Sequence, residues 1–547
     1  MTPDSLGFPS DLGDPSVAGL PDPAELARMA TQMFGAMPRD PMPAPALVPM
    51  DGAQVPAAMP SASTVAAPFG FLDWSRPLFD MKDPLAAPGL AGAPAPNVPM
   101  PPMPAFAEAL RPLESLTVTP HIVPMGWTDV PRMPGMTGGF DAEAIRRDFP
   151  ILQQEVNGHP LIWLDNAATT QKPQSVIDRM SYFYARENSN IHRAAHALAA
   201  RATDAYEGAR DKARRFLHAS SPQEIVFVRG TTEGINLIAQ GWGGRHLNAG
   251  DEVVITWLEH HANIVPWQMI CSAKGAKLKV APVDDRGQVL LDEYQKLLTP
   301  KTRIVSFAHV SNALGTITPV NEMVQMAHRY GARVLVDGAQ AVSHIPVDVQ
   351  SMDCDFYIFS GHKVFAPTGI GVVYGKPDAL EEMPPWQGGG NMIADVTFER
   401  TQYQGPPARF EAGTPSIGDA VGLGAALDYV DRIGMVNINR YEHELLVYAM
   451  DAMQKIPGLH LIGTAPDKAS VLSFVLDGYR TEDVGKALNM EGIAVRSGHH
   501  CAQPILRRFG QETTVRPSLA LYNTFADVDA LCATLWNLKA GRQSLGR

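Results

Sequence analysis

One lysine stands among residue types that together could hold and activate an aldehyde cofactor. Lys363 closely follows the largely apolar run 355–359, with Ser360 and His362 between them. Asp337 comes directly after another apolar run of the same kind. A lysine amine can hold an aldehyde as a Schiff base, a carboxylate can keep a pyridine nitrogen protonated, and a Ser/His pair can hold a phosphate. These residues at strand ends are what a pyridoxal phosphate site needs.

A glycine–threonine turn after another strand-like run could seat the phosphate. Gly230, Thr231 and Thr232 follow the run 224–228 and open a predicted helix. Free backbone N–H groups and a hydroxyl at a helix start bind phosphate well. Threonine is also a common helix N-cap without any ligand, so the turn by itself leaves both interpretations open.

Two more polar side chains follow strand-like runs. His260 comes after the run 252–256, and a histidine there could stack on a flat cofactor ring and move protons. Asn312 comes after the run 303–307 and could donate to the phenolic oxygen of the cofactor or to a substrate carboxylate. A packed histidine and a turn-forming asparagine are the ordinary alternatives.

A cysteine and two arginines near the C-terminus could act on a substrate. Cys501 follows two histidines, and His500 or Arg496 could lower the pKa of its thiol and make it a nucleophile. Arg516 could clamp a substrate carboxylate through two N–H groups. The alternatives are a buried, inert thiol and a surface ion pair. Adjacent His and Cys residues are unlike the usual zinc spacings, so no metal site is predicted.

The elements that must position these residues alternate between strand-like and helix-like stretches from about residue 140. The strand-like runs are 224–228, 252–256, 277–280, 303–307, 333–336, 355–359 and 371–374. Helical stretches between most of them predict an α/β fold with a mainly parallel, seven-stranded sheet covered by helices on both faces. Ligands of such sheets bind at the carboxyl ends of the strands, where the candidate residues stand.

Composition divides the chain into three predicted parts. Residues 1–139 contain 27 of the 47 prolines and 13 of the 24 methionines. Such a segment has too few branched apolar residues to bury a core, so a mostly disordered extension is predicted. Residues 140–427 are predicted to form an N-terminal arm and a large cofactor-binding domain. Residues 428–547 are predicted to form a smaller α+β domain that carries Cys501.

Three apolar islands interrupt the extension, at 26–37, 69–79 and 116–127. The first has helical spacing and the second is rich in aromatic residues. Short apolar islands on a flexible tether are typical of docking motifs for another protein. The alternative is that they fold back onto the globular part of the same chain.

Charge and composition argue against several classes of protein. The net charge is −12 without a long basic run, which argues against nucleic-acid binding. The uncharged stretch 84–107 contains eight prolines, so it cannot form a membrane-spanning helix. No secretion signal is recognised, and four scattered cysteines favour a reducing, cytoplasmic location.

Beyond residue 140 the chain closely resembles the SufS-type (group II) cysteine desulfurases. The segments that carry the resemblance, in the order that the family has them, are 163–173, 190–193, 228–236, 259–267, 337–340, 360–363, 409–415 and 496–501. The resemblance implies a pyridoxal phosphate enzyme of fold type I that acts as a homodimer. It would convert L-cysteine to L-alanine and pass the sulfur, held as a persulfide, to an acceptor protein or small thiol.

The resemblance also implies a role for each candidate residue. Lys363 would carry the cofactor, His260 would stack on the ring, Asp337 would pair with the ring nitrogen, and Gln340 would contact the phenolic oxygen. The residues that would bind the phosphate are Thr232, Ser360, His362 and, from the partner subunit, Thr414.

The remaining residues would act on the substrate. Asn312 and Arg516 would hold its carboxylate, Arg496 would line the pocket, and Cys501 would attack its sulfur. Two alternatives stay open: a selenocysteine lyase of the same fold, and a shell-bound protein with a mainly structural role.

The extension resembles the cargo-loading segments of desulfurases that are packaged inside encapsulin shells. The likeness lies in its length, its placement and its proline- and alanine-rich composition. It implies that residues 1–139 bind an encapsulin shell protein and place the enzyme inside a nanocompartment in the cytoplasm.

Overall fold

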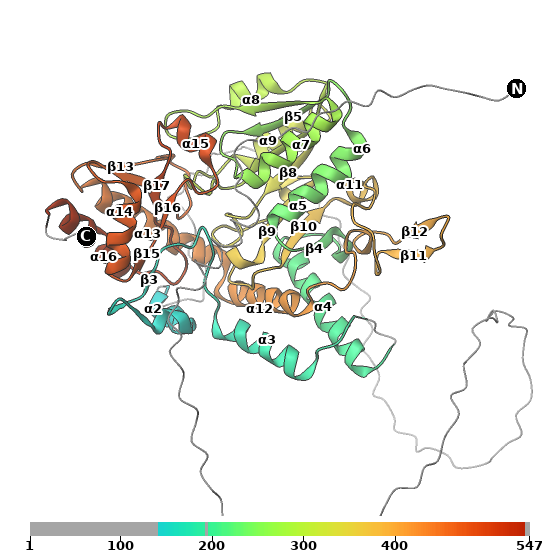
Figure 1. Cartoon of the computed structure of the whole chain (residues 1–547), viewed down its shortest axis with the longest axis horizontal. Coiled ribbons are helices and arrows are strands. Elements are labelled where there is room, and N and C mark those ends of the chain that lie inside the picture. The colour runs from blue at the N-terminus through green and yellow to red at the C-terminus, as the bar shows by residue number, and fades with distance from the viewer. Residues whose placement is uncertain (1–139, 192–194, 542–547) are drawn as a thin grey trace, which may run out of the picture. The chain divides into compact units, whose positions relative to one another are not determined.

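The computed structural model describes residues 140–191 and 195–541. The three predicted apolar islands of the extension, and residues 192 and 193 of the 190–193 segment, lie outside these ranges. Figure 1 shows a large sheet with helices around it, followed by a smaller group of helices and short strands towards the C-terminus.

A seven-stranded sheet forms the centre of the larger part. Each predicted run matches one of its strands to within one residue at either end. The strands are β4 (Ile225–Val228), β5 (Glu252–Thr256), β6 (Lys277–Ala281), β7 (Thr302–Ala308), β8 (Arg333–Asp337), β9 (Phe356–Ser360) and β10 (Gly371–Gly375). Their order is β4-β10-β9-β8-β7-β5-β6, and only β10 is antiparallel to its neighbours. The predicted mainly parallel sheet is confirmed.

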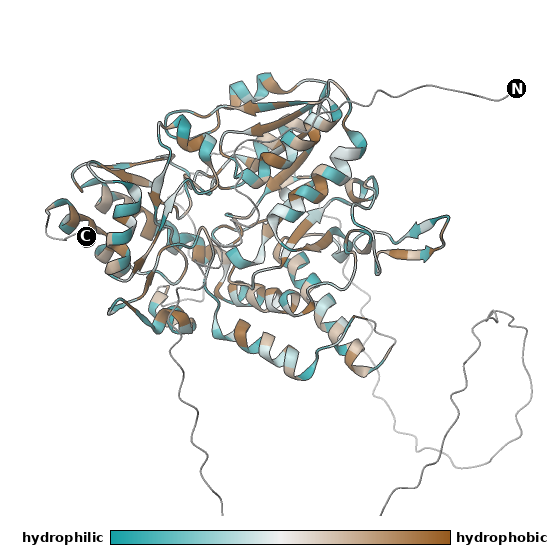
Figure 2. Cartoon of the chain, in the orientation of Figure 1, coloured by the Kyte–Doolittle hydropathy of each residue, from teal (hydrophilic) through white to brown (hydrophobic). Residues whose placement is uncertain are grey.

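The strands are apolar along their whole length because both faces of the sheet are buried. On β5, Val254 enters one hydrophobic core while Val253 and Ile255 enter the core on the opposite face. The central strands are accordingly mostly brown in Figure 2. The helices around the sheet are α3 (Gln174–Arg186), α4 (Ala197–Phe216), α5 (Thr231–Ile238), α6 (Gly244–His246), α7 (Val265–Lys274), α8 (Leu291–Leu297), α9 (Val320–His328), α10 (Val349–Met352), α11 (Pro377–Glu381) and α12 (Ile417–Ile433).

A second hydrophobic core holds the C-terminal part together. Its four-stranded sheet has the order β13-β14-β17-β16. The elements are α13 (Met435–Gln454), β13 (Leu459–Leu461), β14 (Phe474–Leu476), α14 (Thr481–Met490), β15 (Ile493–Ala494), β16 (Arg496–Gly498), α15 (Gln503–Arg508), β17 (Thr514–Arg516) and α16 (Phe525–Lys539). Helix α12 runs through the predicted domain boundary at 427/428.

The N-terminal arm packs against this C-terminal part. Strand β3 (Ile162–Trp163) pairs in parallel with β15, and the ring of Phe140 stacks on Tyr441 with 4.3 Å between centroids. The arm's other elements are α2 (Ala142–Arg147), β1 (Glu155–Val156) and β2 (His159–Pro160). This pairing brings the 163–173 segment next to the strand that leads to Cys501.

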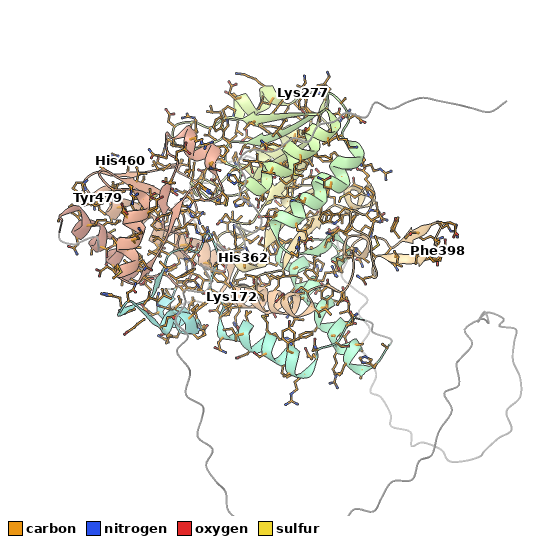
Figure 3. All side chains as sticks on the ribbon, viewed as in Figure 1. Lys172, Lys277, His362, Phe398, His460 and Tyr479 are labelled. Carbon is orange, nitrogen blue, oxygen red and sulfur yellow. The ribbon has the colours of Figure 1, made fainter. Side chains whose placement is uncertain are left out.

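A β-hairpin projects from the larger part. Its strands are β11 (Ile393–Val396) and β12 (Thr401–Tyr403), and Phe398 at its tip is fully exposed and points away from the ribbon (Figure 3). The sequence analysis did not predict this hairpin.

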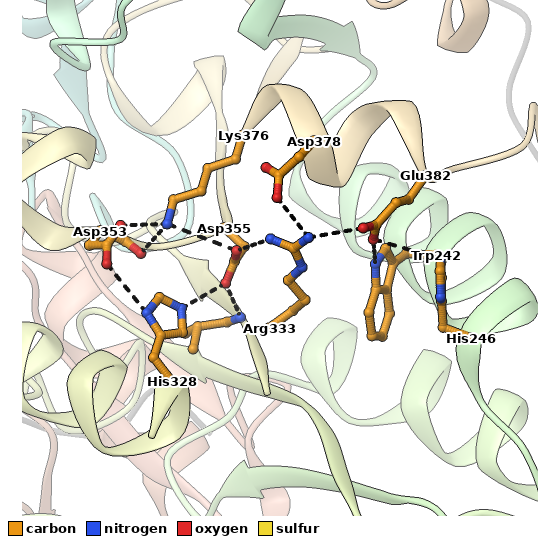
Figure 4. A network of polar contacts seen from close by, with 10 residues as sticks. Trp242, His246, His328, Arg333, Asp353, Asp355, Lys376, Asp378 and Glu382 are labelled. Atoms are coloured by element: carbon orange, nitrogen blue, oxygen red, sulfur yellow. Dashed lines mark hydrogen bonds and ion pairs between the residues drawn. The ribbon is translucent and has the colours of Figure 1, made fainter. Parts of the chain in front are cut away.

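Charged residues join the amino-terminal ends of the central strands, opposite the strand ends that carry the candidate site (Figure 4). Arg333 opens β8 and lies 2.9 Å from Asp355, which precedes β9. Asp355 also lies 2.9 Å from His328, and Arg333 also contacts Asp378 at 2.8 Å and Glu382 at 3.1 Å. The network ties α9, β8, β9 and α11 together.

Among the helices within residues 140–191 and 195–541, none combines the length and the apolar character that crossing a membrane requires. In the same ranges, no three His, Cys, Asp or Glu side chains are grouped so as to hold a metal ion.

Candidate active site

The carboxyl ends of the parallel strands open into one pocket, which also receives residues from the C-terminal part. All of the predicted site residues except Thr414 line it. They are Thr231, Thr232, His260, Asn312, Asp337, Gln340, Ser360, His362, Lys363, Arg496, Cys501 and Arg516. The hydroxyl of Thr414 instead accepts a hydrogen bond from Asn190 at 3.3 Å.

The start of helix α5 forms one end of the pocket. The Ser360 hydroxyl accepts a hydrogen bond from the backbone N–H of Thr231 and lies 2.8 Å from its hydroxyl. Gly371 allows strand β10 to lie close to Gly230, because a Cβ atom on residue 371 would be 2.6 Å from the Cα of Gly230. A helix start with free N–H groups and two hydroxyls is a suitable seat for a phosphate.

Asp337 and Lys363 are the two opposite charges inside the pocket. Burial raises the pKa of Asp337, while the N–H of Ala339, which donates at 3.0 Å, and the positive charge of Lys363 lower it. Burial lowers the pKa of Lys363 to about 8, and the charge of Asp337 opposes that shift. A lysine with this pKa is about one tenth neutral at pH 7, far more than an ordinary lysine, and the neutral amine is the form that attacks an aldehyde.

His260 is neutral in this environment. Burial, followed by the nearby charge of Lys363, lowers the pKa of its imidazole to about 3. Its Nδ1 accepts a hydrogen bond from the N–H of Ala262 at 3.0 Å, so the ring proton is on Nε2. A neutral, oriented imidazole suits stacking on a flat ring.

The segment that follows β3 supports the backbone beside Lys363. The carbonyl of His362 accepts hydrogen bonds from the N–H of Thr170 at 3.0 Å and from the hydroxyl of Thr169 at 3.1 Å. Lys172 donates to the carbonyl of Thr170, and burial lowers the pKa of its amine to about 8. His362 and Lys172 are labelled in Figure 3. We did not predict this support, although the residues belong to a segment that the sequence analysis singled out.

Cys501 lies on a backbone that is held in an unusual conformation. His500 and Cys501 have φ angles of +52° and +53°, a left-handed region that non-glycine residues seldom occupy. Three hydrogen bonds hold this backbone. The Asn312 side chain donates to the carbonyl of His500 at 2.7 Å, and the backbone N–H of His261 donates to the carbonyl of Cys501 at 2.8 Å. The backbone N–H of Cys501 donates to the imidazole of His499 at 3.1 Å. The thiol is therefore presented by a fixed turn at the pocket wall.

His500 does not supply the positive charge that the sequence analysis considered for it. Burial, followed by the charge of Arg516, lowers the pKa of its imidazole to about 3. Its Nε2 lies 2.8 Å from the hydroxyl and 3.1 Å from the carbonyl of Thr514, which a neutral imidazole satisfies. Of the two residues considered as a positive charge near Cys501, His500 and Arg496, only Arg496 remains a candidate.

The two arginines share a carboxylate that the sequence analysis missed. Asp165 lies 3.2 Å from Arg496 and 3.5 Å from Arg516. Burial raises the pKa of Asp165 and both guanidinium groups oppose that shift. Asp165 belongs to the segment 163–173, which was the only sequence signal for it.

Several buried polar atoms of the pocket residues have no hydrogen-bond partner among residues 140–191 and 195–541. They are Oδ1 of Asn312, Nδ1 of His500 and Nε of Arg516. Buried polar groups are nearly always hydrogen-bonded, so these atoms call for a polar ligand. Together with the enclosed lysine, the buried aspartate and the phosphate seat, they fit pyridoxal phosphate and an amino acid.

Comparison with known proteins points to one family. The family model of the class-V aminotransferases matches residues 162–531. A cysteine desulfurase of Synechococcus elongatus is 64% identical over 435 residues, which is 79% of this chain and 69% of that protein. A probable cysteine desulfurase of Mycolicibacterium paratuberculosis is 57% identical over 482 residues, covering 84% of this chain and 70% of its own.

A solved structure shows the same fold. The crystal structure of a cysteine desulfurase from Escherichia coli matches with a TM-score of 0.68 and 40% sequence identity. The match covers 73% of this chain and 98% of the other.

Proposed function

The chain belongs to the class-V aminotransferase family and, within it, to the cysteine desulfurases, and on this premise we propose how its pocket works. Its cofactor is pyridoxal phosphate. We propose that it converts L-cysteine to L-alanine and keeps the sulfur on Cys501. The observation that carries the proposal is that Cys501, from the C-terminal part, lines the same pocket as Lys363 and Asp337, from the central sheet.

Different residues of the pocket would hold the cofactor and move protons. When bound, pyridoxal phosphate supplies an aldehyde that takes up the amino group and a ring that withdraws electrons from the reacting carbons. Asp337 would hold the proton on the ring nitrogen, and His260 would cover the ring. Lys363, with its lowered pKa, would take the proton from the α-carbon and return it to the product.

Cys501 would receive the sulfur. As its Sγ forms a bond to the substrate Sγ, the bond between the substrate Cβ and Sγ breaks. The enzyme keeps a persulfide on Cys501 and releases alanine. The persulfide would then pass to an acceptor protein or a small thiol.

Replacement of Cys501 tests this assignment. Cys501→Ser should keep the cofactor, seen as the yellow colour of the protein, and lose release of sulfide and alanine from L-cysteine. Lys363→Ala is the matched variant, and it should lose the absorbance that belongs to the lysine-bound cofactor. Undiminished turnover of L-cysteine by Cys501→Ser would refute the assignment of Cys501 as the nucleophile. The selenocysteine lyase alternative predicts that this variant still acts on L-selenocysteine at an unchanged rate.

We further propose a homodimer in which Thr414 serves the partner subunit. Thr414 does not line the pocket of its own chain, which supports this role.

The four cysteines are free thiols, which supports a reducing, cytoplasmic location. We retain residues 1–139, 140–427 and 428–547 as the proposed domains.

We also propose that residues 1–139 load the enzyme into an encapsulin shell. The alignment with the Mycolicibacterium relative takes in more of the chain than residues 140–547 contain, so that relative shares part of the extension. Co-expression of the full chain and of residues 140–547 with an encapsulin shell protein tests the proposal. Only the full chain should co-purify inside shells, and packaging of the shorter form would remove the extension from loading.

A further inference from the structure

Asp165 is a buried carboxylate to which the scheme above gives no role. It lies behind the pocket wall, where it pairs with Arg496 and Arg516, both of which line the pocket. Its Oδ1 faces Nη2 of Arg516 at 3.5 Å, an ion-pair contact that is too long to be a strong hydrogen bond. Two guanidinium groups thus face one carboxylate, and the cluster of three keeps one net positive charge.

The backbone holds Asp165 in register with Arg516. Asp165 forms a parallel bridge with Ser518, two residues after Arg516. The carbonyl of Asp165 also accepts hydrogen bonds from the N–H groups of Ala168 at 3.1 Å and Thr169 at 3.2 Å. These contacts fix the backbone of Asp165 beside the strand that carries Arg516.

The guanidinium of Arg516 is only partly engaged. Its Nη1 donates to the carbonyl of Asn312 at 2.8 Å, and its Nη2 faces Asp165. Its Nε is buried without a partner, and the side chain of Arg496 is about half exposed. The pair therefore has donors and one unit of charge left for an anionic ligand.

We propose that Asp165 is a positioning residue that sets the charge of the carboxylate subsite. It holds the two guanidinium groups and cancels one of their charges, so that the subsite matches the single carboxylate of an α-amino acid. The proposal rests on the proposed function, because it assumes that these arginines receive the substrate. It follows that loss of the Asp165 charge tightens carboxylate binding and slows turnover, since the arginines are less well held.

Calorimetric titration of the cofactor-bound enzyme with L-alanine tests this through the net charge of the subsite. Asp165→Asn raises the charge by one and should bind L-alanine on the order of tenfold more tightly. Arg496→Gln lowers it by one and should bind on the order of tenfold more weakly. The double variant restores the charge and should bind as the wild type does. In Asp165→Asn, KM and kcat for L-cysteine should both fall.

The outcomes are decisive in either direction. If Asp165→Asn binds L-alanine no more tightly than the wild type, Asp165 is merely structural. If Asp165→Asn does not fold, the double variant Asp165→Asn/Arg496→Gln decides. If the double variant binds L-alanine as weakly as Arg496→Gln does, the proposal is overturned. Asp527→Asn is the matched control: Asp527 is a buried partner of Arg146 at 3.1 Å, away from the pocket, and its loss should leave L-alanine binding unchanged.

Failure of the proposed function would look different. If the enzyme formed no alanine from L-cysteine but the affinities for L-alanine kept the predicted order, the desulfurase proposal would fall and the charge proposal would stand.

Discussion

Lys363 owes its reactivity to where it is enclosed. In water a lysine amine is almost fully protonated at neutral pH and cannot attack an aldehyde. Burial lowers its pKa to about 8, and the nearby Asp337 keeps the pKa from falling further. The same enclosure raises the pKa of Asp337, and the positive charge of Lys363 opposes that rise. Each charge thus limits the shift of the other.

The pH dependence of cofactor loading follows from this pKa. The apoprotein should bind pyridoxal phosphate faster as pH rises towards about 8, because the neutral fraction of Lys363 grows. Above that pH the rate should level off. Recovery of the visible absorbance after mixing measures the rate. A rate that still rises steeply above pH 9 would mean that Lys363 titrates like an ordinary lysine, whose pKa is 10.5.

Single residues were predictable where the sequence carries a long motif. Lys363 and Cys501 each stand in such a motif, and the structure places both at one pocket. Asp165 was missed because its importance lies in two arginines at the other end of the chain. The charge of His500 was misjudged because burial and the contact with Thr514, neither visible in sequence, keep the imidazole neutral.

At the scale of elements, the strands of the large sheet were predictable because burial on both faces imposes long apolar runs. The short strands were not predictable from the sequence. Pairs such as β3 with β15 join a few residues that are distant in sequence, and two or three residues show no periodicity. The β11–β12 hairpin is largely exposed, so its composition does not distinguish it from a loop.

The network at the amino-terminal ends of β8 and β9 should stabilise the fold. The pKa of Asp355 lies below its usual value because His328, Arg333 and the N–H of Val334 outweigh the effect of burial. Asp355→Asn should lower the free energy of unfolding by about 2 kcal/mol, the order expected for lost charge-assisted hydrogen bonds. Urea unfolding of the cofactor-bound protein measures this.

The size of that loss should depend on pH in one direction. A carboxylate with a lowered pKa stabilises the fold fully above its unfolded value of 3.8, and the benefit is lost as pH falls below that value towards the folded pKa. The loss in Asp355→Asn should therefore be at least as large at about pH 5 as at pH 7, because the carboxylate stays ionised over this range. A loss that disappears by pH 5 would contradict the lowered pKa. Asp451→Asn, which removes an exposed pair with Lys455, should change stability little at either pH.

At the scale of the whole molecule, about three quarters of the chain corresponds to a solved cysteine desulfurase. The Escherichia coli structure is matched over 98% of its length by 73% of this chain, and every element described here lies between residues 140 and 541. The composition break near residue 140 lies close to Ala142, where the first described helix begins, while the domain boundary at 139/140 stays a prediction.

A shortened chain tests that division. Residues 140–547 should fold, bind the cofactor and turn over L-cysteine within about twofold of the full chain, as an independent domain does. Steady-state alanine formation and the thermal midpoint of both forms measure this. If the shorter form lost its turnover or its cofactor, the extension would have to be part of the catalytic fold.

The central claim is that the sulfur of L-cysteine moves onto Cys501. The most direct measurement is the intact mass of the cofactor-bound enzyme after L-cysteine is added without a reductant, followed by peptide mapping. The wild type should gain the mass of one sulfur atom on the peptide that contains Cys501, and Cys501→Ser should gain nothing. A wild-type enzyme that forms alanine while Cys501 stays unmodified, or a sulfur atom found on Cys271, Cys354 or Cys532 instead, would contradict the account.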